Sequence, residues 1–252
     1  MGASCCKRGT IAAAASDEHP VYDHYVKVRG LRALLLGSDT IRLVKASYLL
    51  EINAAGQTYS HRQRLPERAF CPPDMVERIL SELEVMASHS RKTEMTFPGL
   101  VVVSYAWGAK DHPDGEGTQL SAVLAPAIEW YMAERAALIK RGGLLCVGKF
   151  WEQHTWAEGQ TLTEETIDFG CFLDFCSLYQ HLPERKRSAP EEAAFRKGLH
   201  SMDLLYGHQL TVKWRLTRPL PGPDSSRPNS LQQAMIPYSD RGWPFFETTV
   251  SW

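Results

Sequence analysis

The sequence predicts an α/β fold with a mainly parallel β-sheet. The run from Leu100 to Val103 follows Pro98-Gly99 and is apolar without interruption, which is typical of a strand covered on both faces. Phe172-Leu173 predict a second strand, which ends at Asp174. Between them, the segment from Thr118 to Leu138 repeats apolar residues at helical spacing. Strands that alternate with helices favour a parallel sheet, whose ligands bind beyond the carboxyl ends of the strands.

Length and composition limit the function classes. The 252 residues suit one domain of generous size with a full hydrophobic core. A formal net charge of −1, with scattered Lys and Arg, argues against a nucleic-acid partner. No apolar run reaches membrane-spanning length, and the N-terminus lacks the apolar core of a signal peptide. Six cysteines without a repeated spacing favour free thiols in a reducing compartment, so we expect a cytoplasmic protein with neither a metal site nor a bound cofactor.

The N-terminal residues MGASCCKR have the features of a lipid-modified tail. Gly2 follows the initiator Met and fits N-myristoylation, although Cys6 stands where Ser or Thr is preferred. Cys5 and Cys6 are palmitoylation candidates, and Lys7-Arg8 suit anionic lipid. Because a stable anchor needs two such signals, this interpretation places the protein at the cytoplasmic face of a membrane. The alternative is an arbitrary tail over residues 1–20, which we expect to be disordered in either case.

Residues 21–97 are predicted to form a helical lead-in that packs on the main domain. Apolar residues on one face predict a helix over Thr40 to Ala55, namely Ile41, Val44, Tyr48 and Ile52. A basic, extended link over Arg62 to Pro66 follows. Asp74 and Glu77 then predict a capping box. It opens a second helix whose inward stripe is Val76, Ile79, Leu80, Leu83 and Met86.

Residues 98–252 form the main domain in this prediction. After the central strand we expect a loop over Asp111 to Gly117. A long helix follows, with a buried stripe of Leu120, Val123, Leu124, Ala127, Ile128, Tyr131 and Leu138. Gly142-Gly143 end this helix, and Leu144 to Val147 predict a short strand. The pattern predicts no element for the polar, Trp-bearing insertion over residues 149–166.

A further helix and strand complete the alternation. Ser188 and Glu191 predict a capping box at the helix start. Gly207 ends this helix, whose inward stripe is Phe195, Leu199, Met202, Leu205 and Tyr206. Leu210 to Trp214 predict the next strand. Pro219 to Pro228 are rich in Pro, Gly and Ser, which indicates a loop.

Two acidic residues are the strongest candidates for chemistry, and each has a structural alternative. Asp174 ends an apolar strand, where a carboxylate is costly unless it is paired or hydrogen-bonded. It either serves a site or caps neighbouring backbone amides. Glu247 lies four residues after Trp243, on the same face of a helix near whose start Pro244 is tolerated. It is either a functional group or a carboxylate favoured by the helix dipole.

Three stretches, in this order, share residues and spacing with one protein superfamily. The matching positions are Ser104, Tyr105, Trp107 and Gly108 (S-Y-x-W-G), Asp174 with Gln180, and Arg241, Gly242, Trp243 and Glu247 (R-G-W-x-x-x-E). They resemble the Toll/interleukin-1 receptor (TIR) superfamily, and most of all its fungal heterokaryon-incompatibility (HET) branch. The resemblance covers roughly residues 98–252 and implies a flavodoxin-like three-layer sandwich. In two departures, Ala106 replaces the basic residue of many plant TIR domains, and the chain ends at Trp252, before the family's last strand and helix. We therefore expect a fragment or a shortened domain.

The resemblance implies two functions. In TIR domains that cleave NAD, the Glu four residues after the Trp is catalytic, so Glu247 would stabilise oxocarbenium charge on the ribose of NAD, a substrate here. The alternative, which we prefer, is a membrane-tethered signalling domain that forms homo-oligomers and binds unidentified signalling proteins. Either function implies a pocket at the carboxyl ends of the strands, lined by Ser104, Tyr105, Trp107, Asp174, Ser177, Trp243 and Glu247. A hydrolase with a Ser or Cys nucleophile is disfavoured, because no His lies in an activating motif.

Overall fold

The computed structural model describes residues 25–88, 97–105, 107, 112–140 and 164–216, which build an α/β structure around one open sheet. Within these residues the sheet has four strands in the order β1-β3-β2-β4. They are β1 (Val44–Lys45), β2 (Leu100–Tyr105), β3 (Gly170–Phe172) and β4 (Val212–Leu216). β2 is parallel to both β3 and β4, and β1 is antiparallel to β3. The predicted α/β class with a mainly parallel sheet is therefore confirmed.

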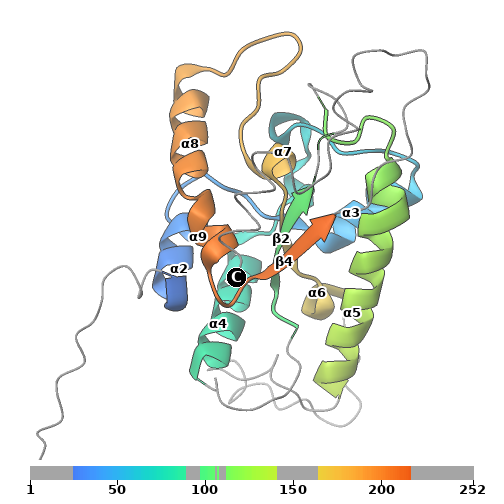
Figure 1. Ribbon diagram of the computed structural model, residues 1–252, viewed down its shortest axis with the longest axis vertical. Helices are drawn as coiled ribbons and strands as arrows, with labels where there is room; N and C mark the ends of the chain where they lie inside the picture. Colours follow the sequence, from blue (N-terminus) through green and yellow to red (C-terminus); the bar gives the residue numbers. More distant parts are fainter. Residues whose placement is uncertain (1–24, 89–96, 106, 108–111, 141–163, 217–252) are drawn as a thin grey trace, which may run out of the picture.

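Helices cover both faces of the sheet (Figure 1). One layer, on the left in Figure 1, contains α2 (Val28–Leu36), α4 (Pro73–Ser88), α8 (Ala189–His200) and α9 (Met202–Gly207). The other layer contains α3 (Ala46–Ala54), α5 (Ala125–Lys140) and α6 (Glu164–Ile167). Two hydrophobic clusters result, one between the sheet and each layer; we call them the α2/α4 cluster and the α3/α5 cluster.

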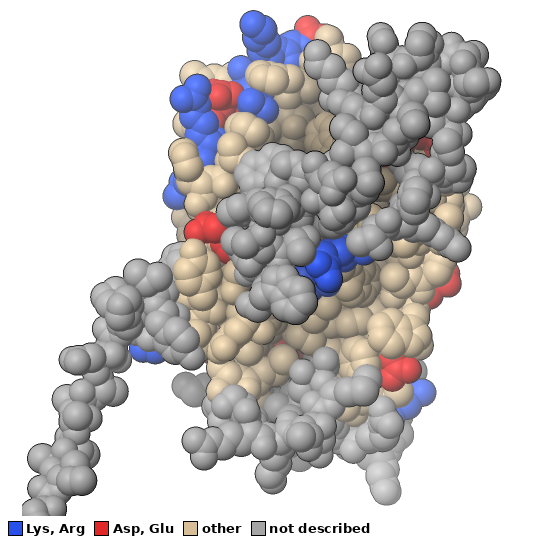
Figure 2. All heavy atoms as spheres, in the orientation of Figure 1, with Lys and Arg blue, Asp and Glu red and all other residues tan. Residues whose placement is uncertain are grey.

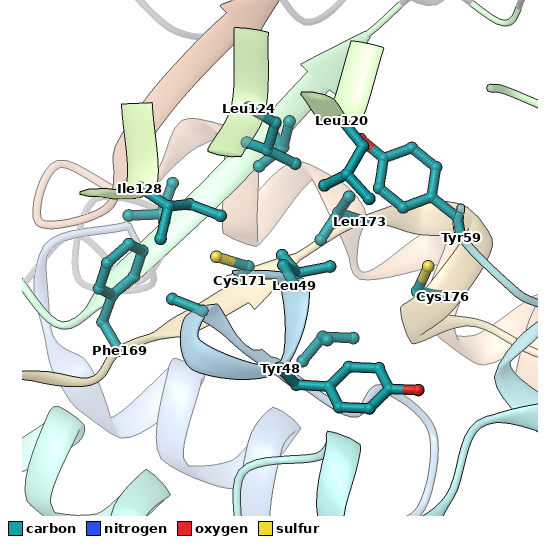
Figure 3. Packing of buried hydrophobic residues seen from close by; sticks show 14 of the residues in the cluster. Tyr48, Leu49, Tyr59, Leu120, Leu124, Ile128, Phe169, Cys171, Leu173 and Cys176 are labelled. Atoms are coloured by element: carbon teal, nitrogen blue, oxygen red, sulfur yellow. The ribbon is translucent and has the colours of Figure 1, made fainter. Parts of the chain in front are cut away.

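The central strand β2 is buried along its whole length, as its apolar run predicts. Val101 and Val103 belong to the α3/α5 cluster, whereas Leu100 and Val102 belong to the α2/α4 cluster, because successive strand residues point to opposite faces. Figure 3 shows part of the α3/α5 cluster, where side chains of α3, of β3 and of the helix after β2 meet. A strand covered on both faces has no solvent side, which explains why its sequence does not alternate.

The prediction of one helix over Thr40 to Ala55 is wrong in its first part. Val44–Lys45 form β1, which pairs with β3, and α3 begins only at Ala46. The Ala46 N–H donates to the Phe169 carbonyl (2.9 Å), which joins this segment to the chain that enters β3. Pairing with a distant strand outweighs the helical spacing of the apolar residues here, so the lead-in supplies a strand to the sheet.

The two predicted capping boxes have different outcomes. α4 begins at Pro73, so Asp74 lies inside the first turn, and Glu77 pairs with an arginine of α2 instead of a backbone amide. Proline suits the first helical position because the N–H that it lacks would have no partner within the helix. At α8 the predicted box is present, since Ser188 accepts from the Glu191 N–H and Glu191 accepts from the Ser188 N–H.

The helix after β2 starts at Thr118, as predicted, but its first turns are irregular. Leu120–Leu124 form a π-helical turn (η3), in which the Ala125 N–H donates to the Leu120 carbonyl, five residues back. Pro126 follows immediately and has no N–H to continue the α-helical pattern, so the wider turn accommodates it. The helix then continues as α5, and the predicted inward stripe packs in or against the α3/α5 cluster, except for the half-buried Ala127.

Other boundaries differ by a few residues. The helix predicted from Ser188 to Gly207 is interrupted at Ser201, which separates α8 from α9. The strand predicted over Leu210 to Trp214 is observed at Val212–Leu216. The remaining predictions lie outside the described residues: the acylation sites Gly2, Cys5 and Cys6, the helix end and strand over 142–147, the loop Pro219 to Pro228, and the segment with Trp243 and Glu247.

Cys71, Cys171 and Cys176 are free and buried. Burial raises the pKa of all three thiols, which leaves them protonated and unreactive near neutral pH. Among the described helices, none is long and apolar enough to cross a membrane.

Candidate functional site

The carboxyl ends of β2 and β3 bring residues of two motifs together. β2 ends at Tyr105, and Asp174 begins the short helix α7 (Asp174–Ser177) just after β3. Because the two strands are parallel neighbours, their ends lie at the same edge of the sheet. The Tyr105 hydroxyl donates to the Asp174 carboxylate over 2.5 Å, although these residues are far apart in the chain.

The Asp174 carboxylate accepts three hydrogen bonds from its own chain. Besides Tyr105, the Phe175 N–H donates over 2.6 Å and the Trp107 side chain is the third donor. Burial raises the pKa of Asp174 above its ordinary value, and the three hydrogen bonds partly oppose that rise. Burial, together with the nearby Asp174, raises the pKa of Tyr105 well above its ordinary value, so this hydroxyl stays a donor.

Phe175 lies at the centre of an aromatic group beside this carboxylate. Its ring lies 5.5 Å from Trp107, 4.6 Å from His61 and 4.8 Å from His112, measured between centroids. His112 is fixed in place, because its Nε2 lies 3.1 Å from the Tyr59 carbonyl and its Nδ1 accepts from a backbone N–H. Sequence reasoning missed both histidines. The Gly, Pro and Asp residues around His112 predict only a loop over Asp111 to Gly117.

A second carboxylate lies at the start of the helix that follows β2. Asp114 is buried and accepts hydrogen bonds from the Gln119 N–H (3.0 Å) and the Leu120 N–H (2.8 Å). These are amides of the first helical turn, which have no partner inside the helix. The chain's own carboxylate therefore occupies the position at which such a helix start would bind an external anion.

The two predicted serine residues lie close to the strands without joining the carboxylate. Ser104 is buried on β2 between Val103 and Tyr105, which both belong to the α3/α5 cluster, so its side chain points to the opposite face of the sheet from Tyr105. Ser177 is buried in α7, where its hydroxyl accepts from the Leu173 N–H (3.1 Å). The Gln180 amide donates to the Asp174 carbonyl (3.1 Å), so the six-residue interval of the second motif closes a turn.

Arg62 stabilises the turn after β3 through its buried side chain, although the sequence predicted only an extended basic link at this position. Residues 62–64 form a 3₁₀ turn (η1), and the Arg62 side chain is 4% exposed. Its guanidinium donates to the carbonyls of Thr40 (2.9 Å) and Ser177 (3.1 Å) and pairs with Asp39. Burial lowers the pKa of this arginine, and the neighbouring Asp39 opposes that effect.

The structure thus gathers Tyr105, Trp107 and Asp174 of the predicted set. Trp243 and Glu247 lie outside the described residues. Among the described residues, no group of three His, Cys, Asp or Glu side chains could hold a metal ion. The chain matches no protein-family model, no curated protein and no solved structure. The function must therefore be argued from the geometry of this edge.

Proposed function

We propose that the chain is a TIR/HET-like signalling domain that acts by self-association, without a catalytic step, and is tethered to the cytoplasmic face of a membrane by its acylated N-terminus. The proposal includes a flavodoxin-like fold. In support, the parallel strands have the order β3-β2-β4, so the first along the chain lies between the second and the third, as in flavodoxin-like sheets. The contacts of Tyr105 and Trp107 with Asp174 support the motif resemblance, because residues of two motifs meet.

The observation that carries the proposal is that the chain's own carboxylates fill this edge of the sheet. Nucleotide-binding α/β folds hold phosphate at a helix N-terminus that follows a strand. Here Asp114 engages the corresponding amides of Gln119 and Leu120. Asp174 is likewise engaged by donors of the same chain. Groups satisfied in this way stabilise the fold and have little capacity left for an anionic substrate.

A paired measurement on the full chain tests the proposal. Acylated protein is added to vesicles that contain anionic lipid, and both its assembly and its release of nicotinamide from NAD are followed. We expect wild type to assemble as its surface density rises, Gly2→Ala to lose vesicle binding, and nicotinamide release to be no greater than with Glu247→Ala. A protein that stays monomeric at every density would contradict the proposal.

NAD cleavage with Glu247 as the catalytic carboxylate is the second candidate. The half-buried Trp107 and its contact with Phe175 favour it, since they give this edge an aromatic surface where α/β folds bind nucleotides. In this alternative Asp174 would position the ribose or a phosphate. Nicotinamide release that disappears in Glu247→Ala, with an unchanged melting temperature, would select it over the scaffold.

A further inference from the structure

Helix α5 exposes an apolar line on its outer side. Its inner side carries the buried residues Ala125, Ile128, Tyr131, Met132, Arg135 and Ile139. At helical spacing, Pro126, Trp130 and Ala133 lie on the opposite side, and all three are exposed. The outermost line of a surface helix is normally polar. An apolar outer line, on a helix that already has an apolar inner side, is typical of a helix covered from both directions.

Trp130 is the dominant side chain of this line. It is 54% exposed, and among the described residues the other exposed large hydrophobic residue is Leu36. The Trp130 ring meets Phe97 edge to face at a centroid distance of 5.8 Å. Because Phe97 is buried in the α3/α5 cluster, this contact supports one side of the indole and leaves the rest exposed. A supported ring of this size loses little conformational freedom on binding.

We propose that the outer face of α5 packs against the same face of a second copy of this chain, with the two helices antiparallel about a two-fold axis. The face consists of Pro126, Glu129, Trp130, Ala133 and Lys140 of α5 and is continued by Ala122 of the preceding turn η3; all six are exposed. The inference rests on the proposed self-association and names the surface that performs it. A two-fold interface brings identical patches together, so the patch must complement itself.

Charge complementarity selects a second copy and sets its direction. Glu129 and Lys140 lie on the same rim of the face, three helical turns or about 16 Å apart. Neither takes part in an ion pair within the described residues. In an antiparallel pair, Glu129 of each copy lies opposite Lys140 of the other, whereas a parallel pair would oppose like charges. Ala133 then lies near the crossing point, where a small side chain permits close approach.

Sedimentation equilibrium of the full chain, run beside a thermal melt, tests this surface. Trp130→Glu is expected to weaken the association constant at least tenfold, because it replaces the largest apolar side chain of the interface with a charge. The matched control is Leu36→Glu, which adds the same charge at the exposed hydrophobic residue of α2. We expect the control to associate like wild type and both variants to melt close to wild type.

Charge reversal provides the sharper result. Glu129→Lys and Lys140→Glu should each weaken association several-fold, and the double variant should restore it. Wild type that associates while every variant behaves the same would overturn this surface and leave the proposed self-association intact. A monomeric wild type would overturn both. If Trp130→Glu lowers the melting temperature and leaves association unchanged, another segment of the same chain covers the face, and the inference is again overturned.

Discussion

The Asp174 carboxylate shows what a buried acid requires of its neighbours. Burial raises its pKa, and the Tyr105 hydroxyl, the Phe175 N–H and the Trp107 side chain oppose the rise. Two of these donors come from the end of β2 and the residues just beyond it, so the first motif supplies donors for the second. The sequence predicted Tyr105, Trp107 and Asp174 as members of one site, but not Phe175. It could not show which donor serves which acceptor, because that depends on how the two strand ends align.

Replacing Tyr105 with Phe should destabilise the protein more at neutral than at acidic pH. The variant leaves Asp174 with one donor fewer, at a cost of about 1–3 kcal/mol at pH 7. Because the folded-state pKa of Asp174 is already raised, and rises further without this donor, the loss shrinks as pH falls and the carboxyl is protonated. Urea unfolding at about pH 7 and about pH 3 measures the difference. Tyr48→Phe is the control, and an equal loss at both pH values for Tyr105→Phe would contradict this account.

At the scale of elements, the sequence predicts a feature correctly where its hydrogen-bond partners are close together in the chain. The box at α8 was predictable because Ser188 and Glu191 satisfy each other within one helical turn. β1 was not, because its partner β3 lies more than a hundred residues along the chain. The cap formed by Asp114 was missed for a related reason: a loop acid several residues before a helix gives no periodic signal. Element type was thus recoverable where hydrogen bonds are local.

The α8 capping box predicts a dependence of stability on acid. An ion pair with Arg185 is the main reason that the pKa of Glu191 falls to about 2, with the Ser188 N–H assisting. Basic and acidic side chains lie together on this part of the surface, at the upper left of Figure 2. A depressed folded-state pKa means that the contribution is complete above about pH 4.5 and is lost as pH falls towards about 2. Glu191→Gln should therefore be less stable than wild type at neutral pH and approach it in acid.

Urea midpoints between about pH 7 and about pH 2.5 check this behaviour. Glu116→Gln, at an exposed position in the loop before the helix that follows β2, is the control. A gap between wild type and Glu191→Gln that stays constant over this range would show that the carboxylate charge is irrelevant.

Removing the Asp114 cap should both destabilise the helix after β2 and create an anion site. Asp114→Ala leaves the amides of Gln119 and Leu120 without their acceptor, at a cost of about 1–2 kcal/mol. Inorganic phosphate should then stabilise the variant more than wild type, because the freed amides and the helix dipole favour an anion. Thermal melts in phosphate and in chloride at equal ionic strength measure this. An equal phosphate effect on both proteins would argue against the blocked-site account of the function.

At the scale of the whole molecule, a buried ion network joins the two helical layers. Glu82 of α4 pairs with Arg135 of α5 (3.2 Å) and with Arg78 (2.7 Å). Arg135 is fully buried and also donates to the carbonyls of Phe97 (2.5 Å) and Ile167 (2.9 Å), just before β2 and β3. The network thus fixes β2 and β3, two of the three parallel strands, at their amino ends. It lies at the edge opposite to the candidate site.

Breaking this network with Glu82→Gln should cost about 3–5 kcal/mol, because Arg135 is left buried without a counter-charge. The control is Glu84→Gln, on the same helix as Glu82. It removes an exposed ion-pair partner of Arg32 and should cost less than about 1 kcal/mol. Urea unfolding compares the two variants. Replacing Glu82 and Arg135 together with Met should recover much of the loss, since the fully buried charge is then removed and Arg78, which also loses its partner, is partly exposed to solvent. A double variant as unstable as the single would contradict the ionic explanation.

The arrangement of the sheet could be predicted only in part. The apolar run of β2 indicated a strand buried on both faces, and the alternation of strands and helices indicated parallel pairing. The strand order β1-β3-β2-β4 could not be read from periodicity, because it depends on which face each connecting helix crosses. The composition of the candidate site could not be predicted fully for the same reason. Its motif residues meet only because β2 and β3 are neighbours in the sheet.

Three buried cysteines in the part of the chain that the structure describes can report local opening of the protein. Each thiol is shielded in a different place: Cys71 in the α2/α4 cluster, Cys171 on β3 and Cys176 in α7. An alkylating reagent can modify them only when the surrounding structure opens, so the labelling rate of each reads the frequency of that event. Peptide mass spectrometry can separate the three labelling rates. One experiment therefore compares how often the structure opens around α7 with how often it opens around the sheet.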